Sequence, residues 1–98
     1  MRHVVVGPDG QCDRSPCGNG TCARAGLLYA QGRLKAGDVF EQRSVIDSPF
    51  TCRCAEEVLV GDAPAIVPEI SGRAWVTAFS AYVMDESDPF GRGFSLTL

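Results

Sequence analysis

The feature that most constrains this chain is a glycine-rich turn in front of a run of helix-forming residues. Residues 13–26 read DRSPCGNGTCARAG, with a proline, a cysteine and then Gly-Asn-Gly. Proline and glycine disfavour a helix interior, so the pattern predicts that a helix begins between Cys17 and Gly20. A buried structural cysteine does not need this setting, whereas a reactive thiol gains from it. The turn therefore predicts both the start of the main helix and a candidate functional residue.

Apolar spacing and later glycines predict the buried face and the end of this helix. A spacing of i, i+4, i+7 and i+11 predicts a buried stripe made of Ala23, Leu27, Ala30 and Leu34. Either Gly32 or Gly37 is expected to supply the left-handed residue that ends the helix. The opposite face of the helix is expected to meet water.

Beyond residue 38 the pattern changes from helical spacing to strands. Turn-forming residues at 47–49 and 61–62 separate the apolar stretches. The expected strands are residues 2–6, 39–46, 50–60, 65–70 and 74–84, followed by a polar tail at 85–93. One main helix against four or five strands predicts an α+β fold, with the helix packed on a mostly antiparallel sheet. At 98 residues the chain is expected to form one domain.

Charge and hydropathy argue against several classes of partner. The net charge is −3 and the nine basic residues are scattered, so we expect neither a nucleic-acid site nor an anionic-membrane surface. No apolar run approaches the roughly 20 residues that span a bilayer. The amino terminus, MRHVVVGPDG, has too short an apolar run for a secretory signal. We therefore expect a cytoplasmic protein with reduced thiols.

The five cysteines are an odd number, which excludes a fully paired set of disulfides within one chain. Strand alternation places Cys52 and Cys54 on the same face as Phe50. In an extended strand Cys52 and Cys54 would lie about 6.6 Å apart, near the outer limit for a disulfide, so a bond between these two cysteines is disfavoured. Zinc is also disfavoured, because neither C-x4-C-x4-C nor C-x-C matches the usual ligand pairs, and we expect no metal. For Cys22, Cys52 and Cys54 the simpler interpretation is a small buried apolar residue.

A thiol at the start of a helix meets unpaired N–H groups and the positive end of the helix dipole, which favour the thiolate. Gly18 and Gly20 lack side chains, so a ligand can approach the backbone, and the same N–H groups can hold a carboxylate. A simpler interpretation stays open, since such turns are common and the cysteine can be incidental. Asp13 can equally cap backbone donors. His3, the one histidine, is expected to be structural and has no obvious partner.

The stretch DRSPCGNGTCARAGLLYAQGRLKAG resembles the carboxy-terminal active-site motif of the proline racemase and hydroxyproline 2-epimerase family, usually DRSPCGTGTSA before a helix. The resemblance continues through FTCRCAEE, AIVPEISGRAWVTAF and DESDPFGRGF. It implies a cofactor-independent mechanism in which two cysteines, one on each side of the substrate α-carbon, exchange protons with it. Cys17 would be one of the pair, Asp13 would contact the substrate amine, and the amides of Gly18 and Asn19 would hold its carboxylate.

Three positions depart from the family pattern. Asn19 replaces a threonine, which keeps backbone binding and removes a hydroxyl contact. Cys22 replaces a serine and is expected to pack. Cys12 stands where the family is more often aliphatic, and its thiol has no assigned role.

The resemblance also implies a missing half. Family members are longer and fold as two similar lobes, like diaminopimelate epimerase, with the other cysteine in a Met-Cys-Gly-His motif that this chain lacks. Residues 1–98 are therefore expected to be a partial domain, the carboxy-terminal lobe, which does not racemise alone. The expected ligand is a small imino acid, proline or 4-hydroxyproline. Two alternatives remain: a non-catalytic lobe that binds an imino acid, self-associates or pairs with a partner chain, and a relative of hydroxyproline dehydratase, which Cys17 disfavours.

Overall fold

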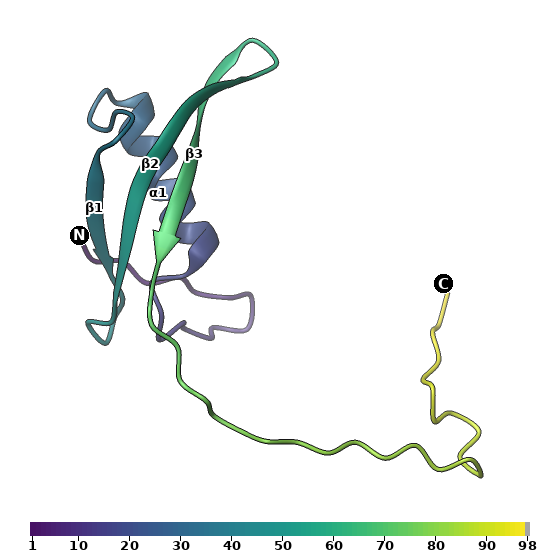
Figure 1. Cartoon of the computed structure of the whole chain (residues 1–98). Coiled ribbons are helices and arrows are strands. Elements are labelled where there is room, and N and C mark those ends of the chain that lie inside the picture. The colour runs from purple at the N-terminus through teal and green to yellow at the C-terminus, as the bar shows by residue number, and fades with distance from the viewer. Residues whose placement is uncertain (98) are drawn as a thin grey trace.

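One helix lies across a three-stranded sheet (Figure 1). The computed structural model describes residues 1–97. Helix α1 (Gly18–Ala30) is followed by strands β1 (Val39–Arg43), β2 (Pro49–Val60) and β3 (Ala63–Ser71). The sheet order is β1-β2-β3 and both pairings are antiparallel. The predicted α+β class, with the helix on an antiparallel sheet, is confirmed.

Helix α1 ends in a Schellman motif, in which a left-handed residue lets two late amides bond back to the last turn. Gly32 has φ +72° and its amide donates to the Tyr29 carbonyl at 3.0 Å. The Arg33 amide donates to the Leu28 carbonyl at 2.8 Å. Of the two glycines predicted as the cap, Gly32 is therefore the one that ends the helix.

The buried face of α1 differs from the predicted stripe. Buried positions on the helix are Thr21, Ala25 and Leu28, whereas the predicted Ala23, Leu27 and Ala30 are exposed. Thr21 can be buried because its hydroxyl donates to the Cys17 carbonyl at 2.7 Å, which satisfies its polar group. Only Leu34, beyond the helix end, is buried as predicted.

The core lies between this helix face and the middle of the sheet. Cys52 and Cys54 of β2 are fully buried, and Phe50 on the same strand is half-buried. Cys52 pairs with Phe40 on one side and Ile70 on the other, so one row of apolar side chains crosses the sheet. The prediction that Cys52 and Cys54 are small buried apolar residues is confirmed.

Burial of these two thiols makes the free energy of unfolding depend on pH. It raises the pKa of both Cys52 and Cys54 above the ordinary value of 9.0. The thiols of the unfolded chain therefore ionise at a lower pH than those of the folded chain. The stability that the buried neutral thiols contribute is complete below the unfolded pKa of 9.0 and is lost as the pH rises through the folded pKa. We expect urea unfolding to give a lower free energy of unfolding at pH 9.5 than at pH 7.5. Equal stability at the two pH values would contradict this.

Strand β2 contains a bulge that the sequence pattern does not reveal. The register against β3 shifts between Cys54 and Glu56, which leaves Ala55 as the extra residue. Beyond the bulge, Glu57 pairs with Ile66, which packs against the helix-facing core. Strict alternation from Cys54 would have turned Glu57 to the other face. The bulge is therefore what brings a carboxylate to the helix side of the sheet.

Two predicted strands are wrong, and a third is shorter. Residues 2–6 make only isolated bridges: Arg2 bridges to Arg43 of β1, and Val6 bridges to Cys12 across the turn at 7–10. β1 ends at Arg43, where a turn closed by Ser44 begins. Residues 74–84 form no strand within the described part of the chain. They extend away from the domain as a long exposed arm (Figure 1).

Candidate active site at the start of helix α1

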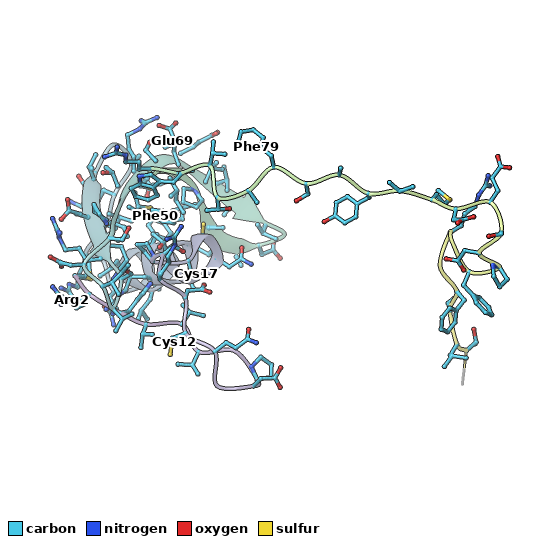
Figure 2. All side chains as sticks on the ribbon, turned by 90° about the horizontal axis from the view of Figure 1, so that it is seen from below. Arg2, Cys12, Cys17, Phe50, Glu69 and Phe79 are labelled. Atoms are coloured by element: carbon cyan, nitrogen blue, oxygen red, sulfur yellow. The ribbon has the colours of Figure 1, made fainter. Side chains whose placement is uncertain are left out.

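Cys17 is the N-cap residue of α1, as the sequence predicts (Figure 2). Its thiol accepts a hydrogen bond from the Gly20 amide at 3.4 Å, the contact that an N-cap side chain normally makes. The backbone of Cys17 has φ +69° and ψ +127°, a conformation that favours glycine. A strained residue that carries a nucleophilic atom is a common feature of functional sites.

This strain predicts an unusual stability effect. Cys17→Gly is expected to be about 1 kcal/mol more stable than Cys17→Ala, because glycine adopts positive φ without strain while alanine keeps the Cβ atom. Both variants lose the thiol, so their difference isolates the backbone. Urea unfolding of the two chains measures it. An alanine variant as stable as the glycine variant would show that the backbone here is relaxed.

A network of hydrogen bonds fixes the cysteine loop. The Cys17 amide donates to the Ser15 hydroxyl at 3.1 Å, and the Thr21 amide donates to the Cys17 carbonyl at 2.9 Å. His3 Nε2 lies 2.5 Å from the carbonyl oxygen of buried Pro16. The expectation that His3 has no obvious partner is therefore wrong, since the amino-terminal segment brings it to the residue before Cys17.

The two amides that follow Cys17 are open. Gly18 and Asn19 occupy the first two helical positions, whose N–H groups have no carbonyl partner within a helix. Both residues are exposed, and among residues 1–97 no hydrogen bond uses either amide. The first turn carries no acidic residue. The arrangement offers two donors and the helix dipole to an anion beside the thiol.

The two glycines of the turn have different roles. At Gly18 an added Cβ would meet nothing within 4 Å, so the approach to the backbone is open as expected. At Gly20 an added Cβ would lie 2.8 Å from Cγ2 of Val5. The absence of a side chain at Gly20 therefore allows close packing of the amino-terminal segment against the helix start.

Asp13 lies at the start of the same loop. Its amide donates to the Val5 carbonyl at 3.2 Å, and its side chain is exposed. No hydrogen bond joins its carboxylate to the Cys17 thiol in the described part of the chain. The structure thus brings Cys17, Gly18 and Asn19 together at one helix terminus and leaves Asp13 at the edge of this group.

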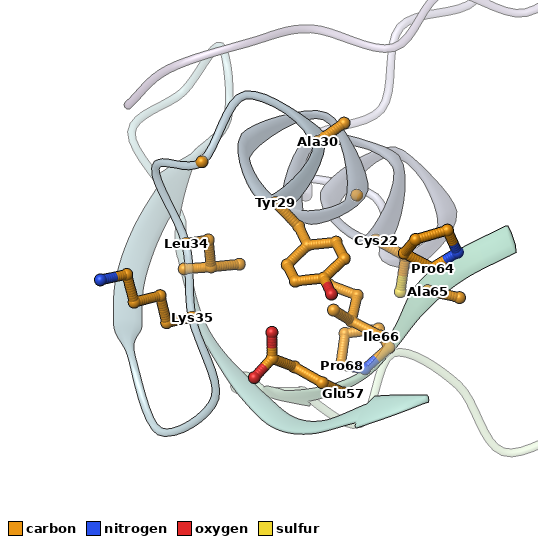
Figure 3. A pocket seen from close by; sticks show the side chains of 12 residues that line it. Cys22, Tyr29, Ala30, Leu34, Lys35, Glu57, Pro64, Ala65, Ile66 and Pro68 are labelled. Atoms are coloured by element: carbon orange, nitrogen blue, oxygen red, sulfur yellow. The ribbon is translucent and has the colours of Figure 1, made fainter. Parts of the chain in front are cut away.

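Two hollows in the surface lie near helix α1 or the cysteine loop, and Cys17 lines neither of them. One of about 860 Å³ separates α1 from β3 and is lined by Tyr29, Glu57 and Ile66, among others (Figure 3). Burial, and then the neighbouring Glu57 carboxylate, raise the pKa of Tyr29. Cys22 lies half-buried on the wall of this hollow, so the expectation that it packs in the core is only partly met. A second hollow, of about 750 Å³, adjoins the cysteine loop at Ser15.

Two further expectations concern metals and membranes. All five cysteines are unpaired. Within residues 1–97, no three His, Cys, Asp or Glu side chains are grouped closely enough to hold a metal ion. In the same range, no helix has the length and apolar character to cross a bilayer.

Residues 1–95 match the sequence model of the family described as "Proline racemase". The chain belongs to this family. The match includes the Cys17 loop, helix α1, the sheet and the arm. The resemblance on the DRSPCGNGTCARAG motif is therefore confirmed at the level of family, and one helix on a three-stranded antiparallel sheet is the part of the epimerase-like fold that this chain provides.

Named relatives include both activities of the family. A proline racemase of Clostridioides difficile is 44% identical over 95 residues, which are 97% of this chain and 28% of that protein. A 4-hydroxyproline 2-epimerase of Streptosporangium roseum is 47% identical over the same coverage. The chain thus spans little more than a quarter of the length of these relatives.

Two solved structures of proteins with these names are similar to this chain in fold and in sequence. A probable proline racemase from Agrobacterium radiobacter K84, with bound carbonate, matches 97% of this chain with a TM-score of 0.80 and 40% identity. A hydroxyproline epimerase from Agrobacterium vitis, with bound trans-4-hydroxy-L-proline, matches with a TM-score of 0.80 and 39% identity. The chain covers 28% and 27% of these two structures.

Proposed function

We propose that this chain supplies one of the two acid–base residues of an enzyme that inverts the α-carbon of proline or 4-hydroxyproline. The residue is Cys17. The observation that carries the proposal is a thiol at the N-cap of α1, beside the two open amides of Gly18 and Asn19. The relatives named proline racemase and 4-hydroxyproline 2-epimerase support this reaction class and favour a small imino acid as the substrate.

The chemistry needs only proton transfers. With the Cys17 side chain as thiolate, the sulfur takes the α-proton and leaves a carbanion-like centre next to the substrate carboxylate. The amides of Gly18 and Asn19, aimed at that carboxylate, stabilise the negative charge that develops there. Asp13 binds the substrate amine. A second thiol on the opposite face then gives its proton to the α-carbon, which inverts the centre, and the reverse reaction exchanges the two roles.

The second thiol comes from a second lobe, and residues 1–98 form the carboxy-terminal lobe of a two-lobe enzyme. The coverage of 28% of a full-length relative supports this division. With one base of two, the isolated chain is expected to exchange a proton on one face of the substrate without inverting it. Five unpaired cysteines suit a reducing compartment, so we place the protein in the cytoplasm.

The test is incorporation of deuterium at the α-carbon in heavy water, with L-proline and trans-4-hydroxy-L-proline assayed separately. Two samples are compared: the 98-residue chain, and a chimera in which residues 1–95 replace the matching segment of the C. difficile proline racemase. We expect the chimera to exchange and racemise at least one substrate. A folded chimera that exchanges neither would support a non-catalytic lobe instead.

A further inference from the structure

The strain at Cys17 lies in the peptide unit that joins Pro16 to Cys17. This unit is planar, so its N–H and carbonyl groups turn together, and its rotation sets φ of Cys17. A half-turn would carry φ of Cys17 from +69° to a negative value, and with the present ψ of +127° the residue would then have the β-region backbone of an ordinary N-cap. The surroundings therefore hold this peptide unit in its strained orientation.

Side chains hold both polar groups of the peptide unit. On one side, the Cys17 amide donates to the Ser15 hydroxyl at 3.1 Å. On the other side, the Pro16 carbonyl oxygen lies 2.5 Å from His3 Nε2. A carbonyl oxygen only accepts, so His3 is the donor and carries a proton on Nε2. A half-turn of the peptide unit would break both hydrogen bonds.

His3 is the better placed of the two donors that the Pro16 carbonyl has within residues 1–97. The other donor, Thr21 Oγ1, lies 3.5 Å from this oxygen, and its single proton serves the Cys17 carbonyl at 2.7 Å. Pro16 is fully buried, and a buried carbonyl without a good donor is costly. Loss of the His3 donor would therefore favour rotation of the peptide unit out of its strained orientation.

The amino-terminal segment fixes His3 to the sheet. The His3 amide donates to the Arg43 carbonyl at 3.0 Å, and the Arg43 amide donates to the Met1 carbonyl at 2.7 Å, so the amino terminus lies beside β1 (Figure 1). His3 and Val5 are half-buried, whereas Val4 between them is exposed, as in any extended segment with one inward face. The backbone of His3 thus lies at the edge of β1, while its ring reaches the cysteine loop.

We propose that His3 is a positioning residue, which holds the Pro16–Cys17 peptide unit and thereby directs the Cys17 thiol toward the substrate. The Cβ atom of Cys17 follows the orientation of the peptide nitrogen on the same Cα atom, so rotation of the unit changes the direction in which the thiol leaves the backbone. His3 itself touches no reacting atom. The proposal rests on the proposed role of Cys17 as an acid–base residue.

Amide hydrogen exchange, measured by NMR on the 98-residue chain, tests the hold on the loop without catalysis. His3→Met and His3→Gln are matched variants, since both side chains are unbranched and of similar length, and only glutamine has an N–H donor. In His3→Met we expect the Cys17 amide to exchange about 10-fold faster or more, while the amides of β2 keep their rates. In His3→Gln we expect both sets of rates to stay within about threefold of the parent. Val4→Met, at the exposed neighbour, should change neither.

Kinetics of the chimera test the consequence for the reaction, with rates expressed per folded enzyme. We expect His3→Met to lower kcat by about 10–100-fold, because the thiol is misdirected. KM should stay within about twofold, because the open amides of Gly18 and Asn19 belong to helix α1 and do not turn with the peptide unit. His3→Gln should keep kcat within about threefold of the parent chimera. His3→Leu replaces the methionine variant if that protein does not fold.

Four results would overturn the proposal. The first is a Cys17 amide that exchanges at the parent rate in His3→Met. The second is equally accelerated exchange in β2, which would make His3 a stabiliser of the whole fold. The third is an unchanged kcat in His3→Met, and the fourth is an equal loss of kcat in His3→Gln, which would assign the effect to the ring and not to its donor. If the parent chimera does not racemise, the proposed function fails, whereas faster exchange of the Cys17 amide alone would still establish that His3 holds the loop.

Discussion

Cys17→Ser in the chimera is expected to lower kcat for racemisation by roughly 10²–10⁴-fold, the contribution of a positioned acid–base group. A serine hydroxyl ionises far less readily than a thiol, so it cannot take the α-proton at neutral pH. Serine is also a good N-cap residue, so the hydrogen bond that the Cys17 thiol accepts from the Gly20 amide has a replacement. The loss should therefore appear in kcat, while KM for the imino acid changes little, because the amides of Gly18 and Asn19 remain.

Cys22→Ser is the matched control for this experiment. It makes the same atomic change five residues further along the chain, inside helix α1, at a residue half-buried on the wall of the hollow between α1 and β3. We expect its kcat to stay within about twofold of the parent chimera. If both variants lose activity equally, the effect is structural and Cys17 is not the base. If neither loses activity, the proposed role of Cys17 is wrong.

The parts of the fold that depend on local chemistry could be predicted from the sequence. Proline and glycine around Cys17 set the helix start, Gly32 set its end, and alternation on β2 set the burial of Cys52 and Cys54. Each of these depends on residues a few positions apart. The same is true of the turn at 61–62, where Gly61 adopts φ +61° between β2 and β3.

The parts that depend on distant segments could not be predicted. The packing of Val5 on Gly20 and the contact of His3 with the Pro16 carbonyl join segments that no local pattern connects. The bulge at Ala55 has no signature in the apolar pattern, yet it decides the face on which Glu57 lies. The apolar composition of residues 74–84 predicts a strand, but the structure leaves this segment extended and exposed, without a strand partner in the described part of the chain.

In the candidate site too, the features set by neighbouring residues could be predicted, whereas those set by distant segments could not. The motif and the physics of helix termini pointed to Cys17, Gly18 and Asn19, and the structure places these three together. The roles given to them and to Asp13 come from the family and stay predictions. The sequence gives no sign that Val5 lies against Gly20 or that His3 meets the Pro16 carbonyl, because both contacts join the amino-terminal segment to the cysteine loop across the turn between them.

Leu28→Ala is expected to destabilise the chain by about 2–5 kcal/mol, the range for removing a buried leucine side chain. Leu28 is 4% exposed and belongs to the core cluster with Ala25, Cys52 and Cys54. Its truncation opens a cavity between α1 and the sheet, next to Ala25, Cys52 and Cys54. Urea unfolding at neutral pH measures the loss. Leu28→Met, which keeps the volume, should cost less than about 1.5 kcal/mol.

The neighbouring leucine provides the control, because the apolar spacing and the structure disagree about which of the two is buried. Leu27 belongs to the stripe expected from the sequence, yet it is 50% exposed. Leu27→Ala should change the free energy of unfolding of the 98-residue chain by no more than about 0.5 kcal/mol. A larger loss of unfolding free energy for Leu27→Ala than for Leu28→Ala would mean that the expected stripe is the buried face. Helix α1 would then be rotated about its axis relative to the structure described here. Because Cys17 caps that helix, such a rotation would also change the direction in which the thiol and the open amides of Gly18 and Asn19 face.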